Sequence, residues 1–179
     1  MEKKKDENYD KIIKLVAVGD GAVGKTSLIR RWAENKFEKT YLKTLGVDIT
    51  DKSIKLENGK KIKMVVWDLA GQESYKSYRS AFYHGTEAIM IVADVTNPAT
   101  FDNLPSWVEE ISKYVGIKVP TIFLANKCDL TDQRKVLLPQ IHQVAKHIGL
   151  KKDQIFETSA LEGINVHEAF TFLAQLSLS

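Results

Sequence analysis

The stretch GDGAVGKTS, residues 19–27, stands between an apolar run at 12–18 and a stretch with helical periodicity at 25–34. It matches the pattern G-x-x-x-x-G-K-[ST], in which loop N–H groups and the N-terminus of the next helix hold the phosphates of a nucleotide. A strand before the loop and a helix after it are the context that this pattern requires. The stretch therefore predicts a phosphate-binding loop in an α/β fold, with Lys25 bringing a positive charge to the phosphates. The predicted phosphate-binding residues are Gly21, Ala22, Val23, Gly24, Lys25, Thr26 and Ser27.

Strand and helix signals alternate along the rest of the chain. Apolar runs of strand length stand at 12–18, 63–67, 88–93, 121–125 and 154–156. Stretches with helical periodicity stand at 25–34, 101–115, 138–148 and 166–176. Continuous apolar runs are typical of strands covered on both faces, and the alternation favours a parallel sheet between two helical layers.

Two local signals add detail to this fold. Asn58-Gly59 lies between extended runs at 47–56 and 61–68 and predicts a β-hairpin. Asn165, with Glu168 three residues later, predicts a capping box at the start of the last helix. We therefore expect a three-layer P-loop fold with a six-stranded, mostly parallel sheet, one antiparallel edge strand and about five helices.

Length and composition indicate one globular domain, because the chain has 179 residues of which 44% are hydrophobic. We expect a flexible extension at 1–10 and the nucleotide-binding domain at 11–179. No apolar run reaches the ~18 residues of a membrane span. The formal net charge of +3 is mild, and much of it comes from lysines near the N-terminus. We interpret that basic end as a solvated tail or, alternatively, a lipid-surface patch, and we expect no nucleic-acid partner.

Two short motifs, NKCD at 126–129 and ETSA at 157–160, each follow a predicted strand. An open α/β sheet binds its ligand at the carboxyl ends of its strands. The Asp129 carboxylate can accept hydrogen bonds from the ring N–H and the amine of guanine, whereas adenine presents an acceptor at the ring position. The Lys127 stem can cover the base, Asn126 can brace the loops, and the Ala160 N–H can donate to the base carbonyl. The predicted base-binding residues are Asn126, Lys127, Asp129, Ser159, Ala160 and Leu161.

Cys128 is the single cysteine of the chain and lies inside the first of these motifs. No second cysteine can join it on a metal, and no histidine lies near it in the sequence. We therefore interpret Cys128 as a spacer whose side chain points away from the nucleotide.

The stretch WDLAGQE, residues 67–73, ends the second strand of the predicted hairpin. Asp68 can hold a water molecule of Mg²⁺ beside Thr26 or, alternatively, only cap the following turn. Gly71 lets the backbone approach a γ-phosphate, and Gln72 can orient an attacking water. In the preceding stretch FEKTYLKTLGVD, residues 37–48, Thr44 is a second candidate hydroxyl ligand of Mg²⁺. The other predicted nucleotide contacts there are Phe37 and Tyr41.

Taken in order, GDGAVGKTS, TLGVD, WDLAGQE, NKCD and ETSA resemble the motifs of the Ras superfamily of small GTPases, most closely its Rab-like branch. The likeness runs from about residue 11 to residue 176. It implies GTP and GDP as ligands and Mg²⁺ as cofactor. It also implies that Thr44 belongs to switch I, that residues 68–72 open switch II, and that Gly21 keeps room for a water-orienting Gln72. By this resemblance the catalytic residues are Lys25, Thr44, Gly71 and Gln72, and the metal ligands are Thr26, Thr44 and Asp68.

Some residues depart from the Rab pattern. Ile49 stands where Rab proteins usually have an aromatic residue, and Leu69 where they have threonine. Trp67 and Tyr83 keep two positions of the aromatic cluster by which Rab effectors sense the nucleotide state. The chain ends LAQLSLS, without the double-cysteine tail that is typical of Rab proteins. A Rab protein and an early-branching Rab-like relative therefore both fit.

The resemblance implies a GTP-hydrolysing molecular switch, linked to vesicle trafficking and read by effector proteins. No arginine in the motifs supplies charge to the transition state, so we expect slow intrinsic turnover, with an activating protein and an exchange factor as partners. We expect a cytoplasmic monomer, peripheral on the cytosolic face of membranes where a C-terminal tail carries a lipid. The alternatives are a non-hydrolysing GTP-binding scaffold and a P-loop kinase acting on a small molecule.

Overall fold

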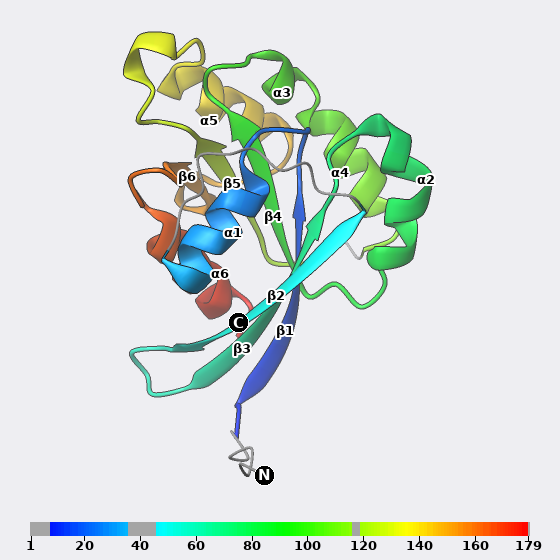
Figure 1. Ribbon diagram of the computed structural model, residues 1–179, viewed down its shortest axis with the longest axis vertical. Helices are drawn as coiled ribbons and strands as arrows, with labels where there is room; N and C mark the ends of the chain where they lie inside the picture. The colour runs from blue at the N-terminus through cyan, green and yellow to red at the C-terminus, as the bar shows by residue number, and fades with distance from the viewer. Residues whose placement is uncertain (1–7, 36–45, 116–118, 179) are drawn as a thin grey trace.

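The sheet runs through the middle of the molecule. The computed structural model describes residues 8–35, 46–115 and 119–178. In this part the strand order is β2-β3-β1-β4-β5-β6 (Figure 1). The strands are β1 (Lys11–Val18), β2 (Val47–Lys55), β3 (Lys61–Leu69), β4 (Ala88–Asp94), β5 (Thr121–Asn126) and β6 (Ile155–Thr158). Only β2, at the edge, pairs antiparallel, which confirms the predicted sheet.

Helices cover both faces of the sheet (Figure 1). On one face lie α1 (Lys25–Glu34) and α6 (Val166–Leu176). On the other lie α3 (Ala99–Asp102), α4 (Leu104–Ser112) and α5 (Leu138–His147), with a single residue between α3 and α4. The side chains of β1 alternate between the two cores, with Leu15 on the α1 side and Val16 on the α4 side. From Leu15 to Val18 both faces of β1 are buried and the sequence is continuously apolar, which confirms the three-layer prediction.

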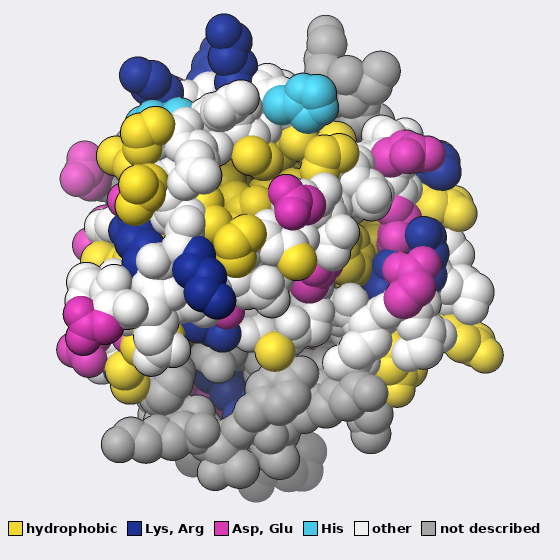
Figure 2. All heavy atoms as spheres, turned by 90° about the horizontal axis from the view of Figure 1, so that it is seen from above, with side chains coloured by type: hydrophobic (Ala, Val, Ile, Leu, Met, Phe, Trp, Pro, Cys, Tyr) yellow, Lys and Arg dark blue, Asp and Glu magenta, His cyan; other side chains and the backbone are white. Residues whose placement is uncertain are grey.

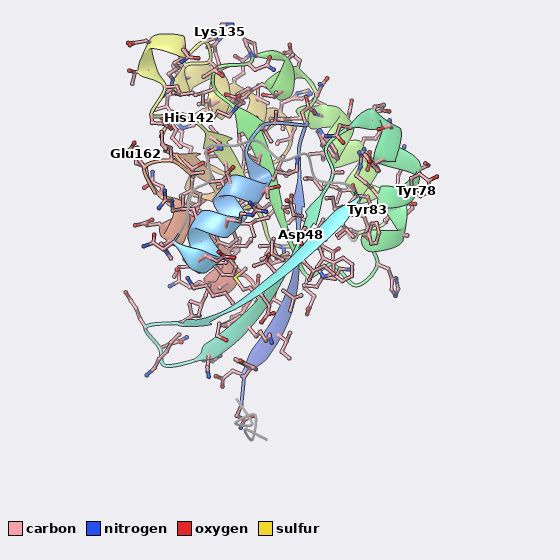
Figure 3. All side chains as sticks on the ribbon, viewed as in Figure 1. Asp48, Tyr78, Tyr83, Lys135, His142 and Glu162 are labelled. Atoms are coloured by element: carbon pink, nitrogen blue, oxygen red, sulfur yellow. The ribbon has the colours of Figure 1, made fainter. Side chains whose placement is uncertain are left out.

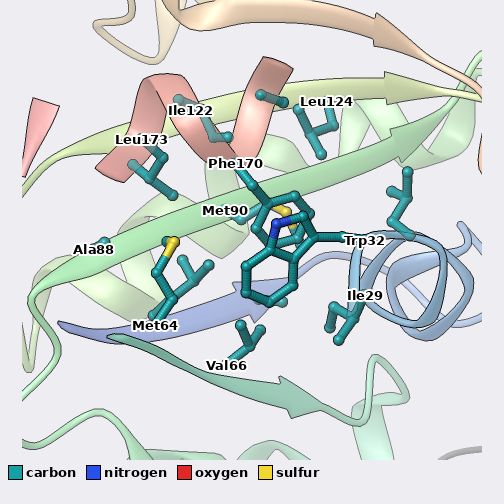
Figure 4. Close-up of a cluster of buried hydrophobic side chains, with 14 of the residues drawn as sticks. Ile29, Trp32, Met64, Val66, Ala88, Met90, Ile122, Leu124, Phe170 and Leu173 are labelled. Atoms are coloured by element: carbon teal, nitrogen blue, oxygen red, sulfur yellow. The ribbon is translucent and has the colours of Figure 1, made fainter. Parts of the chain in front are cut away.

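The core under α1 fixes the helix that begins at the end of the phosphate-binding stretch. Trp32 of α1 and Phe170 of α6 stack with ring centroids 4.3 Å apart and planes 6° from parallel. Met64 and Met90 lie beneath them on the sheet (Figure 4). Because Trp32 is buried, α1 is packed against the sheet and its N-terminus has a defined position at the end of β1.

Short helices follow β3, where no periodicity in the sequence predicts a helix. They are η1 (Glu73–Tyr75), α2 (Lys76–Arg79) and η2 (Ser80–Phe82), of which η1 and η2 are 3₁₀ helices. Two further 3₁₀ helices are η3 (Thr131–Gln133) and η4 (Lys152–Gln154). Each is about one turn long, which is too short to carry an apolar stripe.

The turn between β2 and β3 has the predicted hairpin chemistry. Gly59 has a φ of 83°, and its N–H donates to the Leu56 carbonyl at 2.9 Å. The Asn58 side-chain oxygen accepts from the Lys60 N–H at 3.1 Å, as in an Asx turn. The Asn-Gly prediction is therefore confirmed.

The capping box predicted at the start of α6 is wrong. Asn165 adopts a left-handed conformation, with φ 54°, and makes no side-chain cap hydrogen bond. Its amide instead donates to the Glu157 carbonyl at 2.8 Å, so it fastens the loop after β6. Asparagine tolerates this conformation better than most side chains.

Residues just before β1 lie against the hairpin. The Asp10 N–H donates to the Lys61 carbonyl at 2.9 Å, and the Asp10 carboxylate accepts from the Lys61 N–H at 2.7 Å. The hydroxyls of Ser53 and Tyr9 are hydrogen-bonded at 3.1 Å. Tyr9 and Asp10 are thereby attached to β2 and β3.

Candidate functional site

The phosphate-binding stretch lies directly on two neighbouring strands. A Cβ added at Gly19 would be 2.2 Å from the Val92 carbonyl oxygen of β4. A Cβ at Gly24 would be 2.3 Å from the Asn126 amide nitrogen at the end of β5, and Gly24 also has a φ of 101°. Only glycine fits either position without moving its neighbours. The two glycines thus bring the loop against the carboxyl ends of β4 and β5.

Lys25 is folded under this loop. It is 7% exposed, and its ammonium donates to the carbonyls of Gly19 at 2.7 Å and Asp20 at 2.9 Å. Burial lowers the pKa of Lys25 to about 8, against the opposing effect of the Asp68 and Asp20 carboxylates. The nearby carboxylates balance the charge of this buried ammonium only in part, which favours an additional anionic partner.

The first residue pair of the predicted metal site is in contact. Thr26 opens α1 and Asp68 lies near the end of β3, two elements separated by 42 positions in the sequence. The Thr26 hydroxyl donates to the Asp68 carboxylate. Asp68 is 2% exposed and Thr26 is half-buried, so the pair is largely shielded from solvent.

Gly71 and Gln72 follow β3 and lie over the phosphate-binding loop. A Cβ on Gly71 would be 2.3 Å from the Gly19 carbonyl oxygen, so switch II approaches the loop backbone closely. A Cβ on Gly21 would be 3.6 Å from the Gln72 side chain, which is ordinary contact distance. The Gln72 side-chain oxygen is buried and has no hydrogen-bond partner among the residues that the structure describes. The Gln72 side chain therefore lies near Gly21 through its Cγ and Nε2, while its oxygen is an unsatisfied acceptor.

The base motifs are joined to the phosphate-binding loop. The Asn126 amide donates to the Val23 carbonyl at 2.9 Å and accepts from the Thr158 hydroxyl at 3.1 Å. The Lys127 ammonium donates to the Ala22 carbonyl at 2.9 Å and pairs with Asp94 at 2.6 Å. The NKCD and ETSA motifs and the loop after β1 therefore form one hydrogen-bonded unit.

Cys128 contributes its backbone to this unit, since its N–H donates to the Thr158 carbonyl at 3.0 Å. Burial raises the pKa of the Cys128 thiol, and the Glu157 and Asp129 carboxylates raise it further. A raised pKa reduces the thiolate fraction, which is the nucleophilic form. These surroundings give Cys128 no chemical activation. Asp129, next to it, is half-buried.

Comparison with known proteins agrees with this arrangement. The family model described as Ras family matches residues 14–178. The chain belongs to the Ras family. It is 42% identical over 167 residues to the Ras-related protein Rab-13 of Mesocricetus auratus, which covers 93% of this chain and 80% of that protein. It is 40% identical over 169 residues to the Ras-related protein Rab-8B of Homo sapiens, with coverage of 94% and 80%.

This Ras-family chain is a Rab-like small GTPase that binds guanine nucleotide, hydrolyses GTP to GDP and acts as a switch in membrane trafficking. In the described part of the chain, no helix combines the length and the apolarity that crossing a bilayer requires. Phe37, Tyr41 and Thr44 lie outside the described residues. The other predicted site residues gather at the carboxyl ends of β1, β3, β5 and β6.

The GTPase also uses residues that motif reasoning did not identify. Arg31 of α1 donates to the carbonyls of Ala160 at 2.7 Å and Leu161 at 2.6 Å, and so braces the loop of the second base motif. Asp20 accepts from the Trp107 indole N–H and from the Asn103 amide, both at 2.7 Å. No local signal could have predicted these contacts, because their partners lie 83 to 130 positions apart in the sequence.

The prediction that Tyr83 belongs to an aromatic cluster read by effectors is wrong. Tyr83 is 1% exposed, and its hydroxyl donates to Glu110 at 2.7 Å. It lies on the inner side of the α2 region, whereas Tyr78 lies on the outer side (Figure 3). The ring that contacts Trp67 is Phe82, at 5.9 Å. Ile49 is 50% exposed and stands opposite Trp67 in the β2–β3 ladder, where it takes the place of the usual aromatic residue.

Proposed function

We propose that the nucleotide of this GTPase lies along the loop after β1, with its base between the NKCD and ETSA motifs. Lys25 and the N–H groups at the start of α1 would stabilise the negative charge of the phosphates. Two observations support this proposal: the charge of the buried Lys25 ammonium is only partly balanced by carboxylates, and the loop packs closely at Gly19 and Gly24. Residues 11–179 would form the G domain that contains the whole site.

The residues present fit Mg²⁺. This cation prefers oxygen ligands, and the Thr26 hydroxyl and the Asp68 carboxylate supply two oxygen donors in contact with each other. We propose that Thr26 binds the ion directly, Asp68 through water, and Thr44 as a further hydroxyl ligand. Bound there, Mg²⁺ would offset phosphate charge.

The hydrolytic step needs an oriented water molecule. Gln72 is the proposed orienting residue, because its side chain lies beside Gly21 of the loop and its oxygen has no hydrogen-bond partner in the described part of the chain. The Gly71 N–H would donate to the γ-phosphate, and Lys25 would stabilise charge on the leaving group. None of these residues is an arginine, so we propose that an activating protein completes the charge stabilisation.

GTPases of this family interact with effectors, exchange factors and activating proteins. We propose that the partners of this chain contact switch I, residues 37–48, and the start of switch II. Figure 2 looks onto the end of the molecule where the parallel strands finish, and hydrophobic, acidic and basic side chains lie there side by side.

We also propose a monomer in the cytosol, which reaches membranes peripherally when a lipidated tail is present.

One observation carries the proposal: Asn126 hydrogen-bonds to the phosphate-binding loop through Val23 and to the second base motif through Thr158. One side chain thereby fixes the spacing between the phosphate and base subsites. Asp129, three residues after Asn126, would then lie within reach of a base attached to those phosphates.

The test is nucleotide selectivity of the wild type and of Asp129→Asn, measured by calorimetry. We expect guanine nucleotides to bind at least ~10⁴-fold more tightly than adenine nucleotides, because the wrong base leaves the carboxylate unpaired. In Asp129→Asn, an amide donor should weaken GDP binding and favour a xanthine nucleotide, which has a carbonyl in place of the amine. Asp132→Asn, in η3, is the matched control and should keep guanine selectivity. Equal affinity for ATP and GTP in the wild type would overturn the proposal.

A further inference from the structure

Arg79 of α2 is a buried arginine that none of the motifs contains. It is 2% exposed and lies against α4. Its Nε donates to one oxygen of the Glu110 carboxylate at 2.9 Å and its Nη2 to the other at 2.7 Å. A two-point contact of this kind fixes both the position and the plane of the guanidinium.

The remaining nitrogen of the guanidinium points to the backbone of switch II. Nη1 donates to the Ala70 carbonyl at 3.2 Å and to the Gln72 carbonyl at 2.9 Å. These carbonyls lie on either side of Gly71. The Arg79 guanidinium therefore holds the backbone on both sides of Gly71, the residue that we propose faces the γ-phosphate. The carbonyl after Gly71 is that of Gln72, so Gln72 is held as well.

The same group is connected to the phosphate-binding loop. The Trp107 ring of α4 lies 4.3 Å from the Arg79 guanidinium, a cation–π contact. The indole N–H of Trp107 donates to the Asp20 carboxylate at 2.7 Å. Helix α4 thus holds switch II through Glu110 and the loop through Trp107, so one helix supports both segments.

A cavity of about 570 Å³ lies next to this network, between switch II, α4 and the phosphate-binding loop. Arg79, Trp107, Asp20 and Gly71 are among the residues that line it. Switch II therefore has space to move into when the guanidinium no longer holds its carbonyls.

We propose that Arg79 is a positioning residue for GTP hydrolysis, which holds Gly71 and Gln72 over the phosphate-binding loop through the carbonyls of Ala70 and Gln72. This inference rests on the proposed role of Gln72. Arg79 acts through the backbone of its neighbours and touches no reacting atom. Removing Arg79 should disturb the GTP-bound state more than the GDP-bound state, because only GTP has the γ-phosphate next to which Gly71 and Gln72 are proposed to act.

The experiment compares Arg79→Ala with the wild type, using the whole chain loaded with nucleotide and Mg²⁺. Single-turnover hydrolysis should slow roughly ten- to a hundredfold, since misplacement of about 1 Å in a reacting geometry has effects of this size. Release of a non-hydrolysable GTP analogue should accelerate more than release of GDP. The double variant Arg79→Ala with Gln72→Leu should be no slower than Gln72→Leu alone, because both changes remove the same function.

Glu109→Ala is the matched control, because Glu109 neighbours Glu110 on α4 but pairs with Lys113 at 3.0 Å on the exposed side. It should hydrolyse GTP like the wild type. If Arg79→Ala does not fold, Arg79→Lys takes its place: one ammonium cannot occupy all the donor positions of the guanidinium, so hydrolysis should still slow.

Two results would overturn the inference. One is wild-type hydrolysis in the folded Arg79 variant. The other is equal acceleration of GDP and GTP-analogue release, in step with a lower melting temperature, which would make Arg79 a purely structural residue. Failure of the proposed function is distinguishable, because then Gln72→Leu alone would hydrolyse GTP at the wild-type rate.

Discussion

Gly24 is a residue at which the loop after β1 closely approaches the NKCD motif. The Asn126 amide nitrogen occupies the space that a side chain at Gly24 would need, because it would lie 2.3 Å from an added Cβ. The Asn126 hydrogen bond to Val23 depends on that space. At this position glycine therefore serves two purposes, the positive φ of 101° and the contact between two motifs.

We predict that Gly24→Ala weakens GDP binding at least about tenfold. The added methyl displaces Asn126, and leaving one side of a buried hydrogen bond unsatisfied costs about 1–3 kcal/mol. Gly85→Ala is the control, because Gly85 also has a positive φ, 71°, but no described atom lies within 4 Å of an added Cβ. That variant should lose only about 1–2 kcal/mol of stability from backbone strain. Calorimetry with GDP and urea unfolding separate the two effects, and equal loss of affinity in both variants would contradict the steric argument.

At the scale of elements, α2 depends on its contact with α4. The helix has four residues, and its attachment includes the ion pair between Arg79 and Glu110, with the Tyr83 hydroxyl on the same carboxylate, and the contact of Arg79 with Trp107. Burial by itself raises the pKa of Glu110. Hydrogen bonds from Arg79 and Tyr83 and the positive charges of Arg79 and Lys76 outweigh it, so the pKa of Glu110 is lowered.

This pKa shift predicts how stability depends on pH. The Glu110 carboxyl has a lower pKa in the folded than in the unfolded state, so its stabilising contribution is present above the unfolded value, about 4.3. It is lost as the pH falls from there through the folded-state pKa. The difference in unfolding free energy between wild type and Glu110→Gln should therefore shrink as the pH is lowered from 6 to 3.5, in urea titrations. Glu109→Gln, on the exposed side, should show a small difference throughout. A difference that grows on acidification would contradict this assignment.

Elements with local determinants could be predicted from sequence, and elements held by distant partners could not. The loop after β1 and the Asn58-Gly59 turn depend on residues within a few positions of each other, and both were predicted correctly. Arg79 finds its partner 31 positions away, and Arg31 contacts Ala160 at a separation of 129. Their roles depend on the packing of the sheet, which no local pattern contains. Helix α6 begins directly after Asn165, as the sequence predicts, but the capping box is wrong because the same side chain also suits a left-handed conformation.

At the scale of the whole molecule, the proposed nucleotide site is attached to the core beneath α1. Trp32 is 1% exposed and stacks on Phe170, so it joins α1 to α6 over the sheet. Lys25 and Thr26 stand at the N-terminus of the same helix. A change in this core is therefore expected to affect global stability and the phosphate subsite together.

We predict that Trp32→Ala lowers the free energy of unfolding by about 3–5 kcal/mol through the cavity it leaves, a large share of the 5–15 kcal/mol typical of a domain. Phe172→Ala is the control, since Phe172 is only half-buried against Phe156 on the same core and should cost less. GDP with Mg²⁺ at a hundredfold excess over its dissociation constant should restore about 2.7 kcal/mol to each folded variant, because it binds the folded state alone. Urea unfolding followed by tryptophan fluorescence and circular dichroism should give one coincident transition. Two separate transitions, or no stabilisation by GDP, would mean that the nucleotide site and the core do not form one cooperative unit.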